Sequence, residues 1–133
     1  LARLQWKRFK WVTDNCAANN RYFRENLKKL GFKVHENKLN KEKMVSNRVS
    51  FLVQDRRKII NFFETRGVQL GLWFDGPLSP LPNDEIFNFN LKNYPKANLS
   101  ARNVVNIPCH NRVSNVEREY IRDILEEYKK EEE

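Results

Sequence analysis

Residues 48–74 read RVSFLVQDRRKIINFFETRGVQLGLWF, and this stretch sets the fold class predicted for the chain. Residues 48–54 alternate apolar and polar side chains, which is typical of a strand with one buried face. Asp55 then predicts the N-cap of a helix that ends at Gly67. Residues 68–74 alternate again and predict another strand. Strand, helix and strand in such short succession indicate mixed α and β structure.

Two long helices are predicted at the ends of the chain. Apolar residues at helical spacing predict a helix over residues 3–30 that Gly31 ends, with a stripe of Phe9, Val12, Cys16, Phe23, Leu27 and Leu30. Ser114 and Glu117 form a capping box at the start of the last helix. The apolar stripe of that helix consists of Val116, Tyr120, Ile121, Ile124, Leu125 and Tyr128.

Three shorter elements complete the pattern. Residues 32–35 and 104–107 predict short strands, and a short helix is expected from Tyr94 to Arg102, with Pro95 at its first position. The strands alternate apolar and polar residues, so one sheet face is expected to meet the helices. The chain is therefore predicted to be an α+β two-layer sandwich, in which a small, mainly antiparallel sheet carries its helices on one face.

The charge of the chain is divided unequally along its length. It has 133 residues and a net charge of +8, but residues 1–58 carry 16 Lys and Arg against five Asp and Glu. Residues 114–133 carry four against eight. The basic charge of residues 1–58 is consistent with phosphate binding. It is also consistent with a solvated helix face that has the acidic C-terminal residues packed nearby.

Length and composition predict one soluble cytoplasmic domain with no membrane partner, because no apolar run suffices for a span and no signal peptide opens the chain. Cys16 and Cys109 lack the spacing of a metal site and are expected to be buried thiols. The first residue is Leu1 and the first methionine is Met44, so we expect a fragment of a longer protein.

Candidate functional residues follow two of the predicted strands. Trp73, Phe74 and Asp75 come directly before a Pro-rich loop, where aromatic rings beside a carboxylate suit a hydroxyl-bearing ligand or, alternatively, an anchor between domains. His110 follows Pro108 and suits an acid, base or ligand group, or a residue that orders its own turn. No self-contained catalytic motif is visible, and no metal ligand set is predicted.

Three segments carry a resemblance. Residues 67–78, 94–97 and 102–110 resemble, in order and spacing, the C-terminal part of the DegT/DnrJ/StrS family. These are fold-type I, pyridoxal-phosphate (PLP)-dependent aminotransferases that act mostly on nucleotide-linked keto-sugars. The resemblance covers roughly residues 48–128, and the first helix is similar to the one that joins the family's large and small domains. Residues 73–77, Trp-Phe-Asp-Gly-Pro, stand where the family more often has His-Tyr-Pro.

The resemblance implies a domain assignment for each part of the chain. Residues 1–31 would connect to a large N-terminal domain, and residues 32–133 would form the small C-terminal domain. The Schiff-base lysine and most PLP ligands belong to the large domain, so no cofactor is expected on this chain alone, which would not be catalytic. The resemblance implies a sugar-nucleotide substrate and a homodimer for the full-length protein. It offers as substrate-binding candidates Trp73, Phe74, Asp75 and His110, with Arg102 as a structural or anion-pairing residue.

Two other function classes stay open at the level of sequence. One is a basic α+β nucleic-acid-binding module, suggested by Trp6, Phe9, Trp11 and Tyr22 interleaved with Lys and Arg. Against it, residues 48–54 do not match the aromatic run of a sheet that reads RNA. The other is a protein–protein interaction module that self-associates through the Trp73 face.

Overall fold

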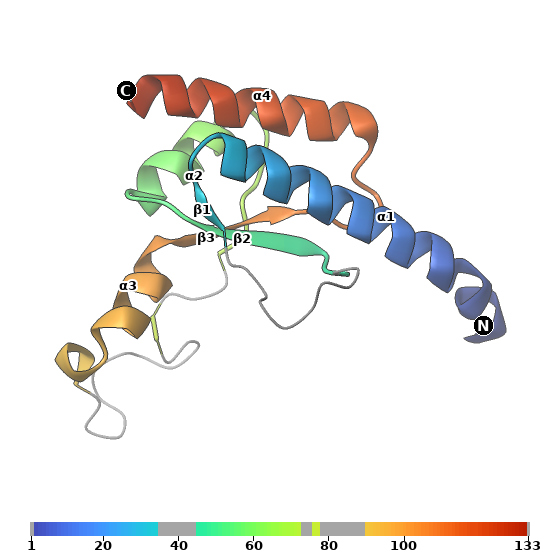
Figure 1. Ribbon diagram of the computed structural model, residues 1–133, viewed down its shortest axis with the longest axis horizontal. Helices are drawn as coiled ribbons and strands as arrows, with labels where there is room; N and C mark the ends of the chain where they lie inside the picture. The colour runs from blue at the N-terminus through green and yellow to red at the C-terminus, as the bar shows by residue number, and fades with distance from the viewer. Residues whose placement is uncertain (1, 35–44, 73–75, 78–89, 133) are drawn as a thin grey trace.

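The computed structural model describes residues 2–34, 45–72, 76–77 and 90–132 (Figure 1). Its elements are, in chain order, α1 (Ala2–Lys29), β1 (Lys33–Val34), β2 (Arg48–Leu52), α2 (Arg56–Glu64), the short 3-10 helix η1 (Leu91–Asn93), α3 (Pro95–Asn103), β3 (Val104–Pro108) and α4 (Asn115–Glu132). No helix in this described part has the length and apolar character of a membrane span.

The three strands form an antiparallel sheet in the order β1-β2-β3. Val49 lies opposite Ile107 and Phe51 opposite Val105, so these four side chains share one face of the sheet. Helices α1, α2 and α4 lie on that side, whereas α3 extends away from the sheet below (Figure 1). The predicted α+β sandwich with a small antiparallel sheet is confirmed.

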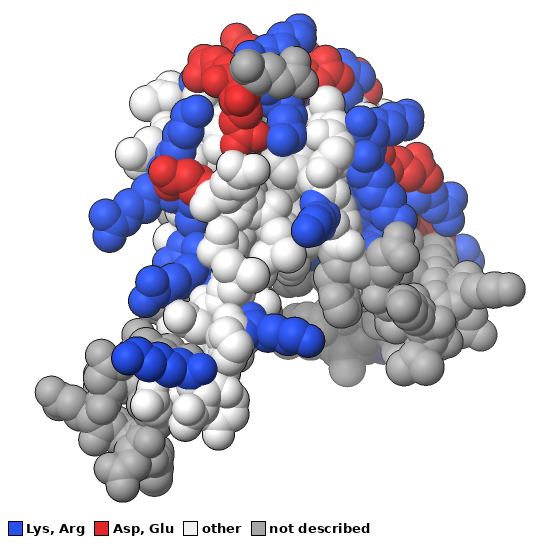
Figure 2. Space-filling model, turned by 60° about the vertical axis from the view of Figure 1, so that its left-hand side comes forward, with Lys and Arg blue, Asp and Glu red and all other residues white. Residues whose placement is uncertain are grey.

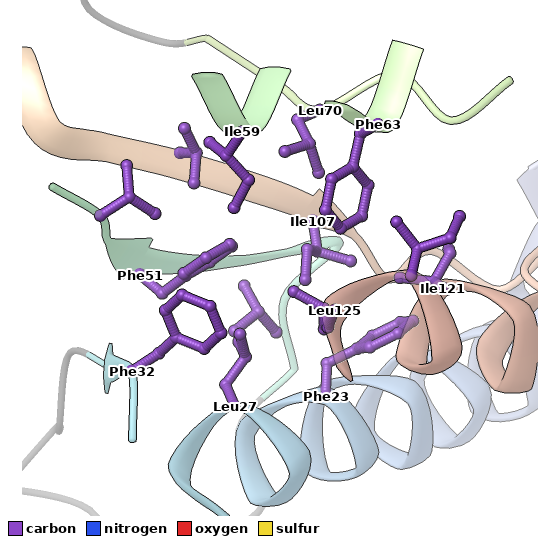
Figure 3. Close-up of a cluster of buried hydrophobic side chains, with 14 of the residues drawn as sticks. Phe23, Leu27, Phe32, Phe51, Ile59, Phe63, Leu70, Ile107, Ile121 and Leu125 are labelled. Atoms are coloured by element: carbon purple, nitrogen blue, oxygen red, sulfur yellow. The ribbon is translucent and has the colours of Figure 1, made fainter. Parts of the chain in front are cut away.

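The hydrophobic core fills the space between that sheet face and the three helices (Figure 3). Phe23 and Leu27 of α1 and Leu125 of α4 are fully buried in it. The rings of Phe32 and Phe51 pack edge to face at 5.1 Å. The second half of α1 therefore belongs to the same core as the sheet.

The helix ends follow the residues that the sequence offers. Asp55 caps α2, because its side chain accepts a hydrogen bond of 3.0 Å from the Lys58 N–H. Gly31 and Gly67 follow α1 and α2 with φ of 78° and 74°, a left-handed conformation that other residues adopt only with strain. Pro95 opens α3 as predicted.

The capping box of α4 is present, and its removal should weaken the helix. The Ser114 N–H donates to Glu117 Oε2 at 2.7 Å, and the Glu117 N–H donates to Ser114 Oγ at 3.2 Å. Because a cap satisfies an otherwise unpaired N–H, Ser114→Ala should lower the free energy of unfolding by about 1 kcal/mol. Urea titration followed by circular dichroism measures this loss.

The stability that Glu117 contributes to this cap should depend on pH in a defined direction. The hydrogen bond from the Ser114 backbone lowers the pKa of Glu117 below its usual value. A carboxylate with a lowered folded pKa stabilises above its unfolded pKa, and this contribution disappears as pH falls through the folded pKa. Glu117→Gln should therefore destabilise at about pH 7, and the loss should shrink as pH falls through the folded pKa of Glu117. Glu131→Gln near the end of α4 is the control; equal losses for both variants at neutral pH would contradict the role of the cap.

The predicted strand over residues 68–74 is wrong for its described part. Within residues 68–72, only Gly71 pairs with the sheet, through a bridge to Asn106 with N–H to carbonyl distances of 2.8 and 3.1 Å. The Val68 N–H instead donates to the Phe63 carbonyl at 3.0 Å, so the segment begins as the C-terminal cap of α2. Residues 73 and 74 lie outside the described residues.

Two predicted apolar stripes extend further than the core does. Phe9 is 57% exposed, although it continues the stripe that buries Phe23 and Leu27. The first turns of α1 project beyond the sheet and α4 (Figure 1), and the ring contact given for Phe9 there is with Trp6 of the same helix. On α4, Val116 and Tyr120 are exposed, and the Tyr120 hydroxyl donates to the Arg66 carbonyl at 2.9 Å.

Acidic and basic side chains are partly paired on the surface. Acidic side chains gather at the top of the face shown in Figure 2, and Lys and Arg spread over the rest of it. On α4, Arg122 pairs with Glu119 at 2.8 Å and with Asp123 at 2.6 Å, and Glu127 pairs with Arg66 of the α2 end at 2.9 Å. Such exposed pairs contribute little to the stability of the fold.

Candidate functional site

A groove opens where β2 begins and β3 ends, beside α2. We call it the His110 groove; its lining residues are Asn47, Arg48, Ile60, Glu64, Gln69, Leu70, Gly71, Leu72, Pro108 and His110. The antiparallel pairing of Arg48 with Pro108 places these two strand ends side by side. The bridge at Gly71 adds residues 69–72 as a third wall.

His110 is exposed in this groove and is held at both its backbone and its ring. Its carbonyl accepts hydrogen bonds from Asn19 Nδ2 at 2.9 Å and from the Val113 N–H at 3.1 Å. Its ring Nδ1 accepts from the Arg112 N–H at 3.2 Å. Because Nδ1 accepts, a neutral His110 ring carries its proton on Nε2, which is then a hydrogen-bond donor.

Cys109 precedes His110 and is buried, outside the lining of the groove. Its thiol donates to the Ser46 carbonyl at 3.0 Å, and Asn20 Nδ2 lies 3.8 Å from the sulfur. Burial raises the pKa of Cys109 to about 12, so the thiol stays protonated and a poor nucleophile at neutral pH. Cys16 is likewise free and buried, which confirms the prediction for both cysteines.

Arg48 is the residue of the groove that sequence reasoning missed. Its guanidinium crosses directly over Gly71: a Cβ built on this glycine would collide with Arg48 Nη1 and lie 3.3 Å from Cζ. A signal for this contact was present in the sequence, because an isolated glycine inside an alternating segment often marks a close approach by another group. Glu64 and Gln69, also unpredicted, line the groove as exposed side chains.

The structure brings together only part of the predicted site. His110 shares the groove with Leu72, the residue before Trp73, whereas Trp73, Phe74 and Asp75 themselves lie outside the described residues. Arg102 is exposed in the last turn of α3, at the start of β3, and His110 follows the other end of that strand. Arg102 is therefore separated from the His110 groove by the length of β3.

Three solved structures share this arrangement of elements. Spr1654 of Streptococcus pneumoniae, assigned as a sugar aminotransferase and solved in its PMP form, has a TM-score of 0.82 and 18% identity over 96% of this chain and 33% of its own. A DegT DnrJ EryC1 StrS aminotransferase from Brucella abortus has a TM-score of 0.76 and 14% identity over 92% and 32%. DesV of S. venezuelae has a TM-score of 0.72 and 16% identity over 96% and 34%.

These similarities show a shared fold, and the chain spans about a third of the length of each of the three proteins. No curated protein sequence matches the chain. The sequence profile of the DegT/DnrJ/EryC1/StrS aminotransferase family matches residues 1–126, nearly the whole chain. The chain thus belongs to the DegT/DnrJ/EryC1/StrS aminotransferase family.

Proposed function

We propose that the chain forms the small domain of a PLP-dependent aminotransferase that acts on a nucleotide-linked keto-sugar. The observation that carries this proposal is the family match over residues 1–126. A span of about a third of each structural neighbour supports the role of one domain within a larger enzyme. In this proposal residues 1–31 connect to the large domain and residues 32–133 form the small one.

The groove does not fit PLP by itself. Aminotransferases hold this cofactor through a lysine, and no lysine within the described ranges lines the His110 groove. Lys58 and Lys129 lie elsewhere, over the rings of Tyr128 and Phe32 respectively. We therefore assign the cofactor to the rest of the enzyme, where it supplies the electron sink for amino transfer, and expect no catalysis by this chain alone.

The small domain would contribute one wall of the substrate cleft. His110 offers a donor at Nε2, and the groove it lines ends at Leu72, directly before the candidate substrate contacts Trp73, Phe74 and Asp75. Arg102, at the far end of β3, suits an anion-pairing or structural role outside this groove. The enzyme as a whole would be a cytoplasmic homodimer.

The first turns of α1 support the connection to a larger domain. Trp6 is 76% exposed, and Phe9 and Trp11 are each 57% exposed. The rings of Trp6 and Phe9 stack at 5.7 Å, so a flat aromatic surface lies in water on the projecting helix. Contiguous apolar surface of this kind marks contact with another protein surface. The amino-terminal domain is the partner proposed for it.

Covalent labelling of lysine tests whether PLP binds to this chain or to the rest of the enzyme. The 133-residue chain is incubated with PLP, reduced with borohydride and weighed by intact-mass spectrometry. We expect only the substoichiometric labelling that the urea-unfolded chain also shows, because no described lysine lines the groove. The longer polypeptide that contains this chain should take up stoichiometric label on a single lysine outside it. Stoichiometric labelling of one lysine within the chain would contradict the proposal.

A further inference from the structure

We propose that the chain carries a docking groove for an acidic segment of another protein, which inserts an apolar side chain beside Leu99. This Leu99 groove lies between α3, the paired residues of β1 and β2, and the last turns of α4. Its apolar lining comes from Phe32, Leu52, Val53 and Leu99. Because it lies at the opposite end of the sheet from the His110 groove, its role is separate from the proposed function.

The Leu99 groove has room for an inserted side chain rather than for a whole small molecule. Its volume is about 280 Å³, whereas pockets that enclose small ligands usually measure about 300–1,000 Å³. Leu99 is 62% exposed and forms one wall, and Leu52 on the sheet is half-buried. Contact with an apolar side chain would remove this aliphatic surface from water, which favours association.

Cations flank the groove without acidic partners. Lys96 and Arg102 lie three residues before and after Leu99, so these exposed side chains share one face of α3. Lys33 is exposed on β1 and lines the groove from the sheet. Within the described ranges, Lys33, Lys96 and Arg102 form no ion pair with a carboxylate. The side of the molecule that carries α2 and α3 comes forward in Figure 2, where Lys and Arg side chains border an uncharged strip.

The described carboxylates at this end of the molecule are already engaged. Glu132 Oε2 accepts a hydrogen bond from Lys129 Nζ at 2.8 Å, and both residues line the groove. Asp55 accepts from the Lys58 N–H as the N-cap of α2. The flanking cations are therefore available to carboxylates of another protein, and such charge complementarity steers association.

The lining favours an acidic protein segment over a nucleic acid. Single-stranded bases stack on exposed aromatic rings. The aromatic ring among the described lining residues is that of Phe32, which is 8% exposed and has Lys129 Nζ over it at 4.7 Å. The aliphatic side chains of Leu52 and Leu99 instead match an aliphatic anchor, and the ammonium groups around them match single carboxylates.

Two fluorescent peptides test the groove by anisotropy with the 133-residue chain. Both are short, rich in glutamate and equal in charge, with central leucines in one and central alanines in the other. The leucine peptide should bind about tenfold more tightly, because its leucines bury more apolar surface. Equal affinities, or no binding of either peptide, would overturn the apolar anchor. Tighter binding of a single-stranded oligonucleotide of the same charge would overturn the class of partner.

Variants then locate the contact. Leu99→Ala should weaken binding of the leucine peptide about tenfold and leave the alanine peptide almost unchanged. Val116→Ala truncates an exposed apolar residue on α4 and is its matched control. Lys96→Gln should weaken both peptides about two- to threefold, whereas Lys7→Gln on the projecting turns of α1 should weaken neither. Equal losses within either pair of variants would overturn the location of the site.

Sedimentation equilibrium separates another protein from a second copy of this chain. Any self-association should persist in Leu99→Ala, because the groove is assigned to a different protein. A dimer that Leu99→Ala dissociates would overturn that assignment in favour of a second copy. These measurements use neither PLP nor a sugar nucleotide, so their failure would leave the small-domain role intact, and stoichiometric lysine labelling would reject that role without affecting the groove.

Discussion

Phe23→Ala should unfold at a far lower urea concentration than the unchanged chain. Phe23 has no exposed surface and lies where α1, α4 and the sheet meet (Figure 3). Truncation removes its apolar contacts and leaves a cavity that the surrounding helices fill only in part. Buried Phe-to-Ala changes of this kind cost about 3–5 kcal/mol. Because small domains have total stabilities of about 5–15 kcal/mol, much of the stability would be lost.

Phe9→Ala on the same helix is the matched control. Its side chain is 57% exposed on the projecting turns, so the same chemical change should alter the free energy of unfolding by no more than about 0.5 kcal/mol. Both variants are compared by urea titration with far-ultraviolet circular dichroism. A large loss for Phe9→Ala would show that the first turns of α1 pack against the body of the chain, contrary to the structure.

Asn19→Leu should have the second-largest effect, through polar groups rather than through packing. Asn19 is 4% exposed and its side-chain amide donates to the carbonyls of His110 and Val113 at 2.9 and 3.1 Å. Its Oδ1 accepts from Arg118 Nη1 at 3.1 Å. Leucine has similar size but removes the hydrogen bonds that Asn19 makes to these buried partners, which should cost about 2–3 kcal/mol.

The same variant should also disturb the groove. Asn19 holds the backbone of His110, so its loss should shift the NMR signals of His110 and Val113 as well as lowering the urea midpoint. Asn15→Leu is the control, because among the described residues the Asn15 side-chain amide bonds the Trp11 carbonyl of its own helix, at 2.8 Å, rather than another element. Equal stability of the two variants would mean that the contact between α1 and the residues after β3 does not support the fold.

Local signals in the sequence were enough for most of the fold. Asp55, Gly67 and the Ser114–Glu117 box act on their own neighbours along the chain, so their consequences can be predicted without a tertiary structure. The strand prediction for residues 68–72 was wrong because the alternating pattern does not determine the backbone hydrogen bonds. Alternation describes which side chains share a face, but the hydrogen bond from Val68 to Phe63 assigns the start of the segment to a helix cap.

The site was less predictable because it depends on which strand ends meet. His110 could be chosen from its position after Pro108, but Arg102 looked equally close to β3 in sequence and lies at the other end of that strand. Arg48 became visible as a site residue only when the bridge at Gly71 placed this glycine beneath the guanidinium. The isolated glycine indicates that some group approaches closely, but no pattern along a single segment identifies Arg48 as that group.

The exposed tryptophans on the projecting turns of α1 determine what intrinsic fluorescence can report. The chain has three tryptophans, and Trp6 and Trp11 lie on those turns with 76% and 57% of their surface exposed. The buried cluster, as far as the described residues form it, is built from Phe, Tyr and aliphatic side chains and Cys109. Emission from Trp6 and Trp11 therefore follows whatever covers the start of the helix. A blue shift on mixing with a candidate amino-terminal domain would detect docking while the core stays unchanged.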